Sequence, residues 1–234
     1  MIAFYVLVLR NSHVAIRTPR LGAFMYQFEQ ALWKKDIQLV AGTDEAGRGP
    51  LAGPVVASCV ILPAPDEYLI NGLNDSKLLS EKKRENLFQL IQEHAQVGIG
   101  VISEKTIDKI NIYQATRLAM KTAFENLPVL PNYLLIDGPL KLDIRCPSKS
   151  IIKGDRKSAS IAAASIIAKV TRDRLMKQYD EQYPQYNFKQ HKGYATKRHK
   201  HSIEQFGPCP IHRRSFSPIK DLVRVGGKYS YEIR

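Results

Sequence analysis

The chain of 234 residues carries 35 lysines and arginines against 22 aspartates and glutamates, a formal net charge of +13. Its 44% hydrophobic content excludes a disordered polyelectrolyte, and the positive charge favours a polyanionic partner such as nucleic acid. The three cysteines are far apart and form no C-x-x-C pair, which argues against a zinc site or a disulfide framework and favours a cytoplasmic protein. The apolar run at residues 2–9 is too short to span a bilayer and lacks a cleavage site, so we expect neither a membrane segment nor a signal peptide.

The first predicted strand, residues 38–43, ends at two adjacent acids, Asp44 and Glu45. Successive side chains of a strand point to opposite faces, so both carboxylates serve one site only if the strand ends or bends there. The Gly47-Arg48-Gly49 turn follows, and glycine both tolerates unusual backbone angles and leaves peptide N–H groups open to a ligand. We interpret the stretch as an acidic metal-binding strand end beside a turn that contacts phosphate or sugar. A charged surface turn is the alternative.

The middle of the chain predicts two more strands and two helices. Residues 54–62 are rich in β-branched side chains and end at prolines, which is typical of a buried strand. Ser80 is suited to cap the first helix. The remaining predicted elements are a polar loop, a helix, a strand and a second helix, at residues 74–77, 81–94, 97–102 and 112–127.

Two further strands also run into acids. Residues 133–136 are apolar and lead into Asp137, and the short strand at 150–152 is followed by Asp155. A run rich in alanine then predicts a long helix over residues 159–179 that packs closely against the sheet. We therefore expect a mixed sheet in which the first two strands are antiparallel and the acids converge along one edge.

The predicted organisation is an α/β domain at residues 38–184 between two extensions. We assign no role to the N-terminal extension at residues 1–37, whose first 24 residues precede a more ordinary start at Met25. The C-terminal extension at residues 185–234 is polar and basic, with short helical pieces. From residue 189 onward it carries eleven lysines and arginines against three acids, which favours a substrate-binding face.

An acid follows an apolar strand three times in this chain. This recurrence indicates a metal-binding site. Clustered carboxylates are costly unless cations compensate them, and ligand sets made only of oxygen suit Mg²⁺ or Mn²⁺. Two such ions can activate water and stabilise the leaving oxygen of a phosphodiester. A basic protein with an acidic pocket has the charge layout of a metal-dependent nuclease. The candidate ligands are Asp44, Glu45, Asp137 and Asp155.

Six segments, in the same order along the chain, resemble the bacterial ribonuclease HII family, the type 2 ribonucleases H. The match spans roughly residues 38–220 and comprises Asp44-Glu45-Ala46-Gly47-Arg48-Gly49-Pro50, Asp75-Ser76-Lys77, Asp137-Gly138, Lys153-Gly154-Asp155, the run at 162–173, and His191-Lys192-Gly193-Tyr194. The resemblance implies the ribonuclease H-like α/β fold, a mixed sheet flanked by helices with a small helical C-terminal extension. It also implies cleavage of RNA in RNA–DNA hybrids and incision of duplex DNA at embedded ribonucleotides.

The resemblance also implies roles for individual residues. The four acids become the catalytic metal ligands, and the Gly47-Arg48-Gly49 turn matches the turn whose backbone contacts the 2′-OH of the substrate ribonucleotide. That group is what distinguishes RNA from DNA. Tyr194 matches the tyrosine that stacks on the sugar beside the RNA–DNA junction. Ser76 and Lys77 are expected to contact backbone phosphate, with a solvated loop as the alternative.

Several other residues receive a structural interpretation. Asp173 follows an arginine inside a long helix, and we expect it to form a surface ion pair. Four histidines of the basic segment have irregular spacing and no cysteine partners, so we expect phosphate contact or exposure for His191, His199, His201 and His212. The motif at residues 213–216 also resembles the family and is expected to support the substrate face.

The sequence therefore predicts a monomeric cytoplasmic endonuclease that cuts 5′ of a ribonucleotide and leaves 3′-hydroxyl and 5′-phosphate ends, with Mg²⁺ or Mn²⁺. The expected partners are RNA–DNA hybrids and ribonucleotide-containing duplex DNA, with a replication clamp as a further candidate. A basic nucleic-acid-binding module without catalysis is one alternative. A DNA-directed nuclease of the same fold is the other, although it has no 2′-OH to recognise.

Overall fold

The computed structural model describes residues 25–63, 70 and 72–224. Five strands form one mixed sheet in the order β3-β2-β1-β4-β5. β1 is antiparallel to β2, and β2 to β3, whereas β4 is parallel to both β1 and β5. The strands are β1 (Val40–Ala46), β2 (Val55–Ile61), β3 (Gln96–Ile102), β4 (Tyr133–Asp137) and β5 (Ser148–Ile151). The expected mixed sheet with an antiparallel first pair is confirmed.

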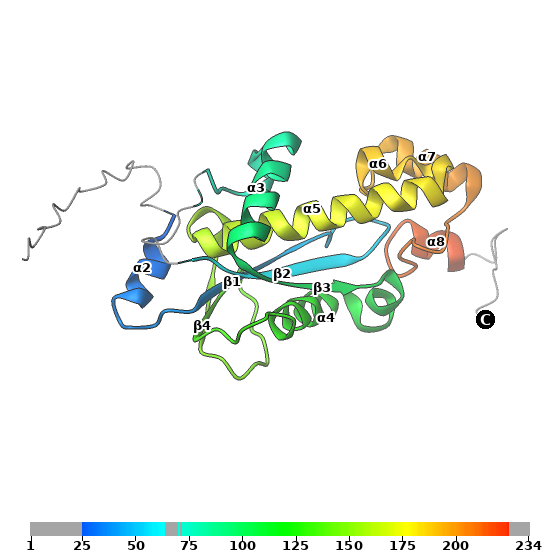
Figure 1. Ribbon diagram of the computed structural model, residues 1–234. Helices are drawn as coiled ribbons and strands as arrows, with labels where there is room; N and C mark the ends of the chain where they lie inside the picture. The colour runs from blue at the N-terminus through cyan, green and yellow to red at the C-terminus, as the bar shows by residue number, and fades with distance from the viewer. Residues whose placement is uncertain (1–24, 64–69, 71, 225–234) are drawn as a thin grey trace, which may run out of the picture.

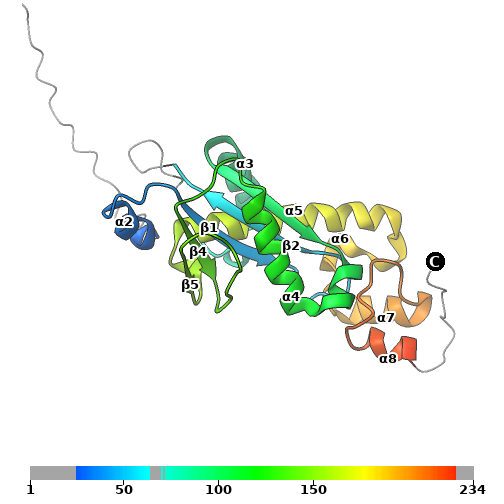
Figure 2. The same cartoon turned by 90° about the horizontal axis from the view of Figure 1, so that it is seen from below.

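Helices cover both faces of this sheet. The long helix α5 (Ala159–Gln182) crosses one face together with α3 (Glu81–His94), and α4 (Glu104–Glu125) lies on the other (Figures 1 and 2). The short helix α2 (Gln27–Trp33) lies at one end of the molecule (Figure 1). The opposite end holds three short helices, α6 (Phe188–His191), α7 (Lys197–Phe206) and α8 (Ile219–Arg224). Three 3₁₀ turns complete the chain, η1 (Ser76–Leu78), η2 (Gly154–Arg156) and η3 (Pro184–Tyr186). In the described part of the chain, no helix has the length and apolar character needed to cross a membrane.

The first half of α5 lies unusually close to β1. A Cβ atom on Gly42 would stand 2.2 Å from the backbone carbonyl carbon of Ser160, so only glycine fits there. The consecutive alanines near the start of α5, Ala162, Ala163 and Ala164, are fully buried. Small side chains on both elements therefore let the helix start beside β1, and this brings η2, which precedes the helix, next to the end of that strand.

The element boundaries differ from the sequence-based expectation at several places, of which two matter most: the end of β1 and the start of α4. β1 does not end before its acids, because Asp44 and Glu45 continue the antiparallel pairing opposite Ser58 and Ala57. α4 begins at residue 104 rather than 112, because the Ser103 hydroxyl accepts a hydrogen bond from the Thr106 N–H and starts an additional segment.

The two segments of α4 meet at Asn111, whose φ of 66° breaks the helix. Its side-chain oxygen accepts a hydrogen bond from the Gln114 N–H and so caps the second segment. The predicted helix is therefore the second half of α4.

The segment before β1, to which the sequence assigned no role, caps α5. Glu29 of α2 is fully buried, and its Oε1 accepts hydrogen bonds from the Ser158 hydroxyl at 2.6 Å and from the Ser160 N–H at 2.9 Å. A carboxylate at a helix N-terminus satisfies unpaired N–H groups and complements the helix dipole. Residues 25–37 are thus part of the fold, whereas residues 1–24 lie outside the described residues.

The basic C-terminal extension shares a hydrophobic core with the rest of the molecule. Leu51 and Ala52, which follow the glycine turn, pack with Met176 of α5 and with apolar residues of the extension. Those residues are Tyr186, Phe188, Ile203, Ile211 and Ile219. The extension is thereby fixed against both the end of α5 and the turn after β1. Its short helices agree with the sequence-based expectation.

Candidate active site

Three of the four predicted acids come from the carboxyl ends of neighbouring parallel strands. Thr43 of β1 lies opposite Ile136 of β4, so Asp44 and Asp137 follow side by side. Asp155 lies in η2, directly after β5, which pairs with β4. Asp44 is two positions from Gly42, which faces α5, so alternation along the strand turns the Asp44 side chain to the α5 side of the sheet.

The acids influence one another electrostatically. Burial, reinforced by the charges of Glu45 and Asp137, raises the pKa of Asp44 well above its usual range. Burial also raises the pKa of Glu45, although the nearby Arg48 guanidinium opposes the shift. The pKa of Asp155 is raised by burial and by the charges of Asp75 and Asp137. The sheet edge thus holds a cluster of carboxylates with too little positive charge.

Backbone and side-chain donors fix part of this cluster. Asp137 Oδ1 accepts a hydrogen bond from the Gly154 N–H at 2.7 Å, which ties the end of β4 to η2. Asp44 Oδ1 accepts from the Glu45 N–H at 2.7 Å. The Glu45 carboxylate lies 3.2 Å from the Arg48 guanidinium, an ion pair between the acidic strand end and the glycine turn.

The oxygen-only donor set has the chemistry that hard divalent cations require. No group of three or more His, Cys, Asp or Glu residues within the described residues is arranged to hold a metal ion. Holding an ion would therefore require side chains of the cluster to rotate. Glu45 follows Asp44 in the strand and points to the other face, so it would join the other acids only if the end of β1 bent and its ion pair with Arg48 broke. The raised pKa values indicate that a cation at this edge would relieve repulsion among buried carboxylates. The residues present fit a divalent ion by their donors, and the acids that would hold it are Asp44, Glu45, Asp137 and Asp155.

The Asp75-Ser76-Lys77 loop borders the acid cluster. Asp75 is buried and accepts a hydrogen bond of 2.9 Å from Arg156, a neighbour of Asp155 in η2. Burial raises the pKa of Asp75. Hydrogen bonds from the Lys77 N–H and the Arg156 guanidinium outweigh this effect and hold that pKa below its usual range. The Ser76 hydroxyl is buried and bonds to the Ser165 hydroxyl at 2.7 Å, so it contacts α5. Lys77 is exposed.

The glycine turn and Tyr194 lie together, although 145 positions separate Gly49 from Tyr194 in the sequence. A Cβ on Gly49 would stand 3.8 Å from Cε1 of the Tyr194 ring. The Leu51 N–H donates to the Gly193 carbonyl at 2.8 Å and joins the two segments. Tyr194 is 44% exposed, so its ring is available beside the turn.

Two buried arginines beneath the turn were not identified as site residues from the sequence. Arg172 and Arg213 are 1% and 0% exposed, and both donate to backbone carbonyls of residues 47–54. Burial lowers the pKa of Arg172 to about 10 and that of Arg213 to about 9, so both stay charged at neutral pH. The only signal in the sequence was their presence in motifs shared with the family.

The histidine expectation is wrong for His199 and His212. His191 is half-buried, with both ring nitrogens hydrogen-bonded to backbone groups of Tyr186 and Gly193. His201 is exposed as expected.

His199 and His212 are buried, with their Nε2 atoms 3.0 Å apart. His212 Nδ1 accepts a hydrogen bond from the Cys209 N–H, so we assign the proton of the His212 ring to Nε2. This Nε2–H donates to His199 Nε2. The proton of the His199 ring is then on Nδ1, which donates to the Tyr194 carbonyl at 2.9 Å.

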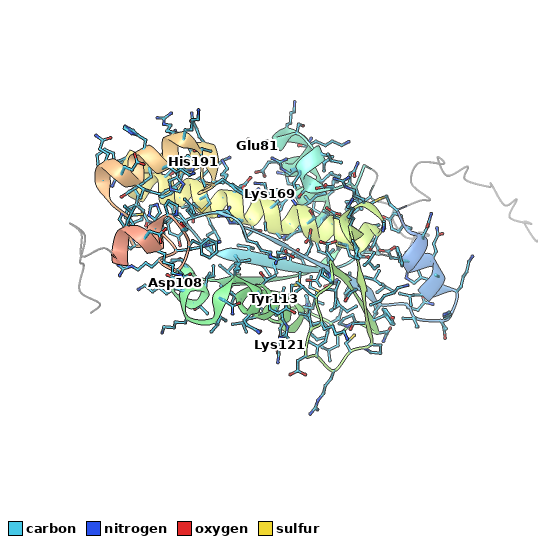
Figure 3. All side chains as sticks on the ribbon, turned by 180° about the vertical axis from the view of Figure 1, so that it is seen from behind. Glu81, Asp108, Tyr113, Lys121, Lys169 and His191 are labelled. Carbon is cyan, nitrogen blue, oxygen red and sulfur yellow. The ribbon has the colours of Figure 1, made fainter. Side chains whose placement is uncertain are left out.

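The expected ion pair of Asp173 is confirmed, although both side chains are partly buried rather than at the open surface. Its carboxylate pairs with Lys169 one turn earlier on α5, at 2.7 Å. Figure 3 shows Lys169 on α5, on the side where α3 and α6 lie.

The mixed sheet with acids at its parallel strand ends places the chain among the ribonuclease H-like α/β proteins. The ribonuclease H2 of Pyrococcus horikoshii superposes with a TM-score of 0.67 at 27% identity, covering 78% of this chain and 96% of that one. The RNase HII of Archaeoglobus fulgidus, solved in complex with PCNA, gives a TM-score of 0.64 at 25% identity over 75% and 93% of the two chains. The predicted fold class is thus confirmed.

Sequence comparison identifies the family. The family model for ribonuclease HII matches residues 41–219. The ribonuclease HII of Enterococcus faecalis is 58% identical over 200 residues, which cover 85% of this chain and 77% of that relative. The chain belongs to the ribonuclease HII family, a family of endoribonucleases, and its function is that of a ribonuclease H.

Proposed function

We propose that this ribonuclease H cleaves the RNA strand of RNA–DNA hybrids and incises duplex DNA on the 5′ side of an embedded ribonucleotide. The observation that carries the proposal is the position of the glycine turn. Arg48 pairs the turn with the acidic strand end, and Gly49 lies beside the Tyr194 ring, which is 3.8 Å from where a Cβ on Gly49 would stand. A site that recognises a ribose therefore adjoins a site suited to phosphodiester hydrolysis.

Each group in this site has a distinct task. The free N–H groups of the Gly47-Arg48-Gly49 turn bind the 2′-oxygen, which deoxyribose lacks. Tyr194 stacks on the adjoining sugar, and its exposed ring requires no rearrangement of the core. Lys77, exposed beside Asp155, binds a backbone phosphate. We assign the other proposed phosphate contact, at Ser76, to its backbone, because its hydroxyl is engaged with Ser165.

The four acids would hold divalent cations, Mg²⁺ or Mn²⁺, and a bound ion would supply activation of water and stabilisation of the departing 3′-oxygen. The buried Asp44 and the partly buried Asp137 stand at the ends of two adjacent strands, which keeps the cluster on a rigid part of the sheet. Glu45 leaves Arg48 to join the cluster, and Arg48 is then free to contact the substrate backbone. Cleavage in this sense yields 3′-hydroxyl and 5′-phosphate ends.

The decisive experiment uses a labelled DNA duplex with one ribonucleotide, incubated with Mg²⁺, with Mn²⁺ or with chelator, beside the same duplex made only of DNA. We expect a metal-dependent cut 5′ of the ribonucleotide, a 5′-phosphate that a ligase accepts, and an intact control. Tight binding without a cut, on this duplex and on a continuous hybrid, would instead support the non-catalytic binding module. Cleavage of the all-DNA control would support the DNA-directed nuclease.

We also propose that the chain acts as a monomer in the cytoplasm. A sliding clamp is a proposed partner, supported by the archaeal relative whose structure includes PCNA. Co-migration of the chain with its own organism's clamp in gel filtration would test this partner.

A further inference from the structure

The guanidinium groups of two buried arginines, Arg172 and Arg213, orient the peptide groups of the glycine turn from the interior of the protein. Arg213 donates to the carbonyls of Gly47 at 2.6 Å, of Arg48 at 2.8 Å and of Gly53 at 2.8 Å. Arg172 donates to the carbonyls of Ala52 and Pro54, at 3.1 and 3.0 Å. Two side chains from distant parts of the sequence thus bind most of the carbonyl groups between residues 47 and 54.

The hydrogen bonds from the arginines to these carbonyl groups determine the direction in which the N–H groups of the same peptide bonds point. In a planar trans peptide the C=O and the following N–H point in opposite directions. Because the Gly47 and Arg48 carbonyls point inward to Arg213, the N–H groups of Arg48 and Gly49 point outward. Within the described residues neither N–H has a hydrogen-bond acceptor, and both residues are exposed. The outward side is also where the Tyr194 ring lies against Gly49.

The packing leaves the turn little freedom to rearrange. Gly47 has φ of 95°, and a Cβ there would stand 2.0 Å from Nε of Arg172. Arg172 also donates to the Lys192 carbonyl at 3.0 Å, and this links the turn to the segment that carries Tyr194. Within the described residues neither guanidinium forms a salt bridge with a carboxylate, so the carbonyl dipoles are their main compensation for burial.

We propose that Arg172 and Arg213 are positioning residues that hold the Gly47-Arg48-Gly49 turn in the conformation in which its free N–H groups meet the 2′-oxygen of the ribose. The inference rests on the proposed recognition of ribonucleotides by this turn. It assigns the selectivity for ribose to two buried arginines that touch no substrate. Lysine cannot replace them, because only a guanidinium offers a planar fork with five donors.

Conservative variants test the inference without removing charge. We expect Arg213→Lys and Arg172→Lys each to lower kcat/KM on the single-ribonucleotide duplex by about ten- to a hundredfold, because small misplacements of positioning groups have effects of this size. The all-DNA duplex, added as a competitive inhibitor, measures general binding, and its Ki should change less than about twofold, because the outer basic surface is intact. Arg117→Lys is the matched control, since Arg117 on α4 also donates to a backbone carbonyl, that of Lys141.

The outcomes separate the inference from the proposed function. Equal losses in kcat/KM and in affinity for the all-DNA duplex would overturn the inference, and so would unchanged kcat/KM in both variants. If the wild-type protein itself fails to cut the ribonucleotide duplex, the proposed function fails instead.

A measurement on the wild-type protein covers the case in which the variants do not fold. In chelator, amide hydrogen exchange at Arg48 and Gly49 should be fast in the free protein. It should slow with the single-ribonucleotide duplex more than with the all-DNA duplex. Slow exchange in the free protein, or equal protection by both duplexes, would contradict the proposed orientation of the turn.

Discussion

At the scale of single residues, we expect the proposed site to depend most on Asp44. It is the most buried of the four acids, it lies next to Asp137, and burial raises its pKa. Asp44→Asn keeps the shape of the side chain but removes the charge that a divalent cation needs. We expect cleavage to fall by about a thousandfold or more, which corresponds to roughly 4 kcal/mol of transition-state stabilisation. Hybrid affinity, measured by fluorescence anisotropy in chelator, should remain within a few-fold.

Asp173→Asn is the matched control for this prediction. Asp173 is also an acid of low exposure, but it is paired with Lys169 on α5. Its variant should keep nearly full activity. If Asp44→Asn lost binding as much as turnover, the division between acidic catalysis and basic binding would be wrong.

The acids of the site could be predicted from the sequence and the buried arginines could not. Asp44, Asp137 and Asp155 each follow an apolar strand, and the direction of parallel strands brings such residues together. By contrast, Arg213 lies in a basic segment where an arginine is normally solvated. Only the path of the chain, which returns residues 211–213 to the turn after β1, shows that it is buried beneath carbonyl groups. The same long-range packing turned the Ser76 hydroxyl toward Ser165.

At the scale of elements, α2 stabilises the start of α5 through Glu29. This carboxylate is fully buried and accepts from the Ser158 hydroxyl and the Ser160 N–H. We expect Glu29→Ala to lower the free energy of unfolding by about 1–3 kcal/mol, because it leaves buried donors without acceptors. Urea denaturation followed by circular dichroism measures this loss. Glu93→Ala, at an exposed position of α3, should change stability by less than about 0.5 kcal/mol.

Equal effects of these two substitutions would show that the contact of α2 with α5 is unimportant. The contact between Glu29 of α2 and the start of α5 could not be predicted from the sequence. Glu29 and Ser158 are 129 positions apart, and no local pattern marks a glutamate in one helix as the cap of another.

The buried histidine pair that joins α7 to the following segment makes stability depend on pH. Burial lowers the pKa of His199 to about 4 and that of His212 to about 3, whereas an unfolded histidine titrates near 6.5. Below pH about 6.5 the unfolded chain therefore binds more protons than the folded one. The stability that the pair contributes is complete above this pH and is lost as the pH falls toward 4, by about 1.4 kcal/mol per histidine per pH unit.

Urea denaturation between pH 7 and 4.5 tests this dependence by comparing the wild-type protein with His199→Gln. The site carboxylates with raised pKa values act in the opposite direction, but both proteins contain them, so the difference isolates the histidine. We expect the difference in unfolding free energy to shrink as the pH falls. His201→Gln, an exposed position on the same helix, should run parallel to the wild type. A constant difference for His199→Gln would exclude the neutral pair.

At the scale of the whole molecule, the full sequence has a net charge of +13, whereas the acidic cluster is confined to one edge of the sheet. The basic C-terminal extension is fixed to the sheet domain by the hydrophobic core that it shares with Leu51 and Met176. It is also held by Asp108 (Figure 3), which accepts hydrogen bonds from the Arg214 and Ser215 N–H groups before α8. Its surface charges therefore keep a defined position relative to the glycine turn. A composition count predicted the basic face, but only the shared core shows that the extension packs against the turn after β1.

This arrangement predicts a graded dependence of binding on salt. Each phosphate contact releases condensed counterions, so the logarithm of affinity should fall linearly with the logarithm of salt, with a slope of about −0.9 per contact. Lys197 and Lys200 are exposed on α7. Changing both to Gln should reduce the slope by about two units, measured by anisotropy on an all-DNA duplex from 50 to 300 mM salt. The matched control changes Lys34 and Lys35, which are exposed at the opposite end of the molecule after α2 (Figure 1). The control alters the net charge equally, so an equal change of slope would mean that the affinity comes from overall charge rather than from a binding face on the extension.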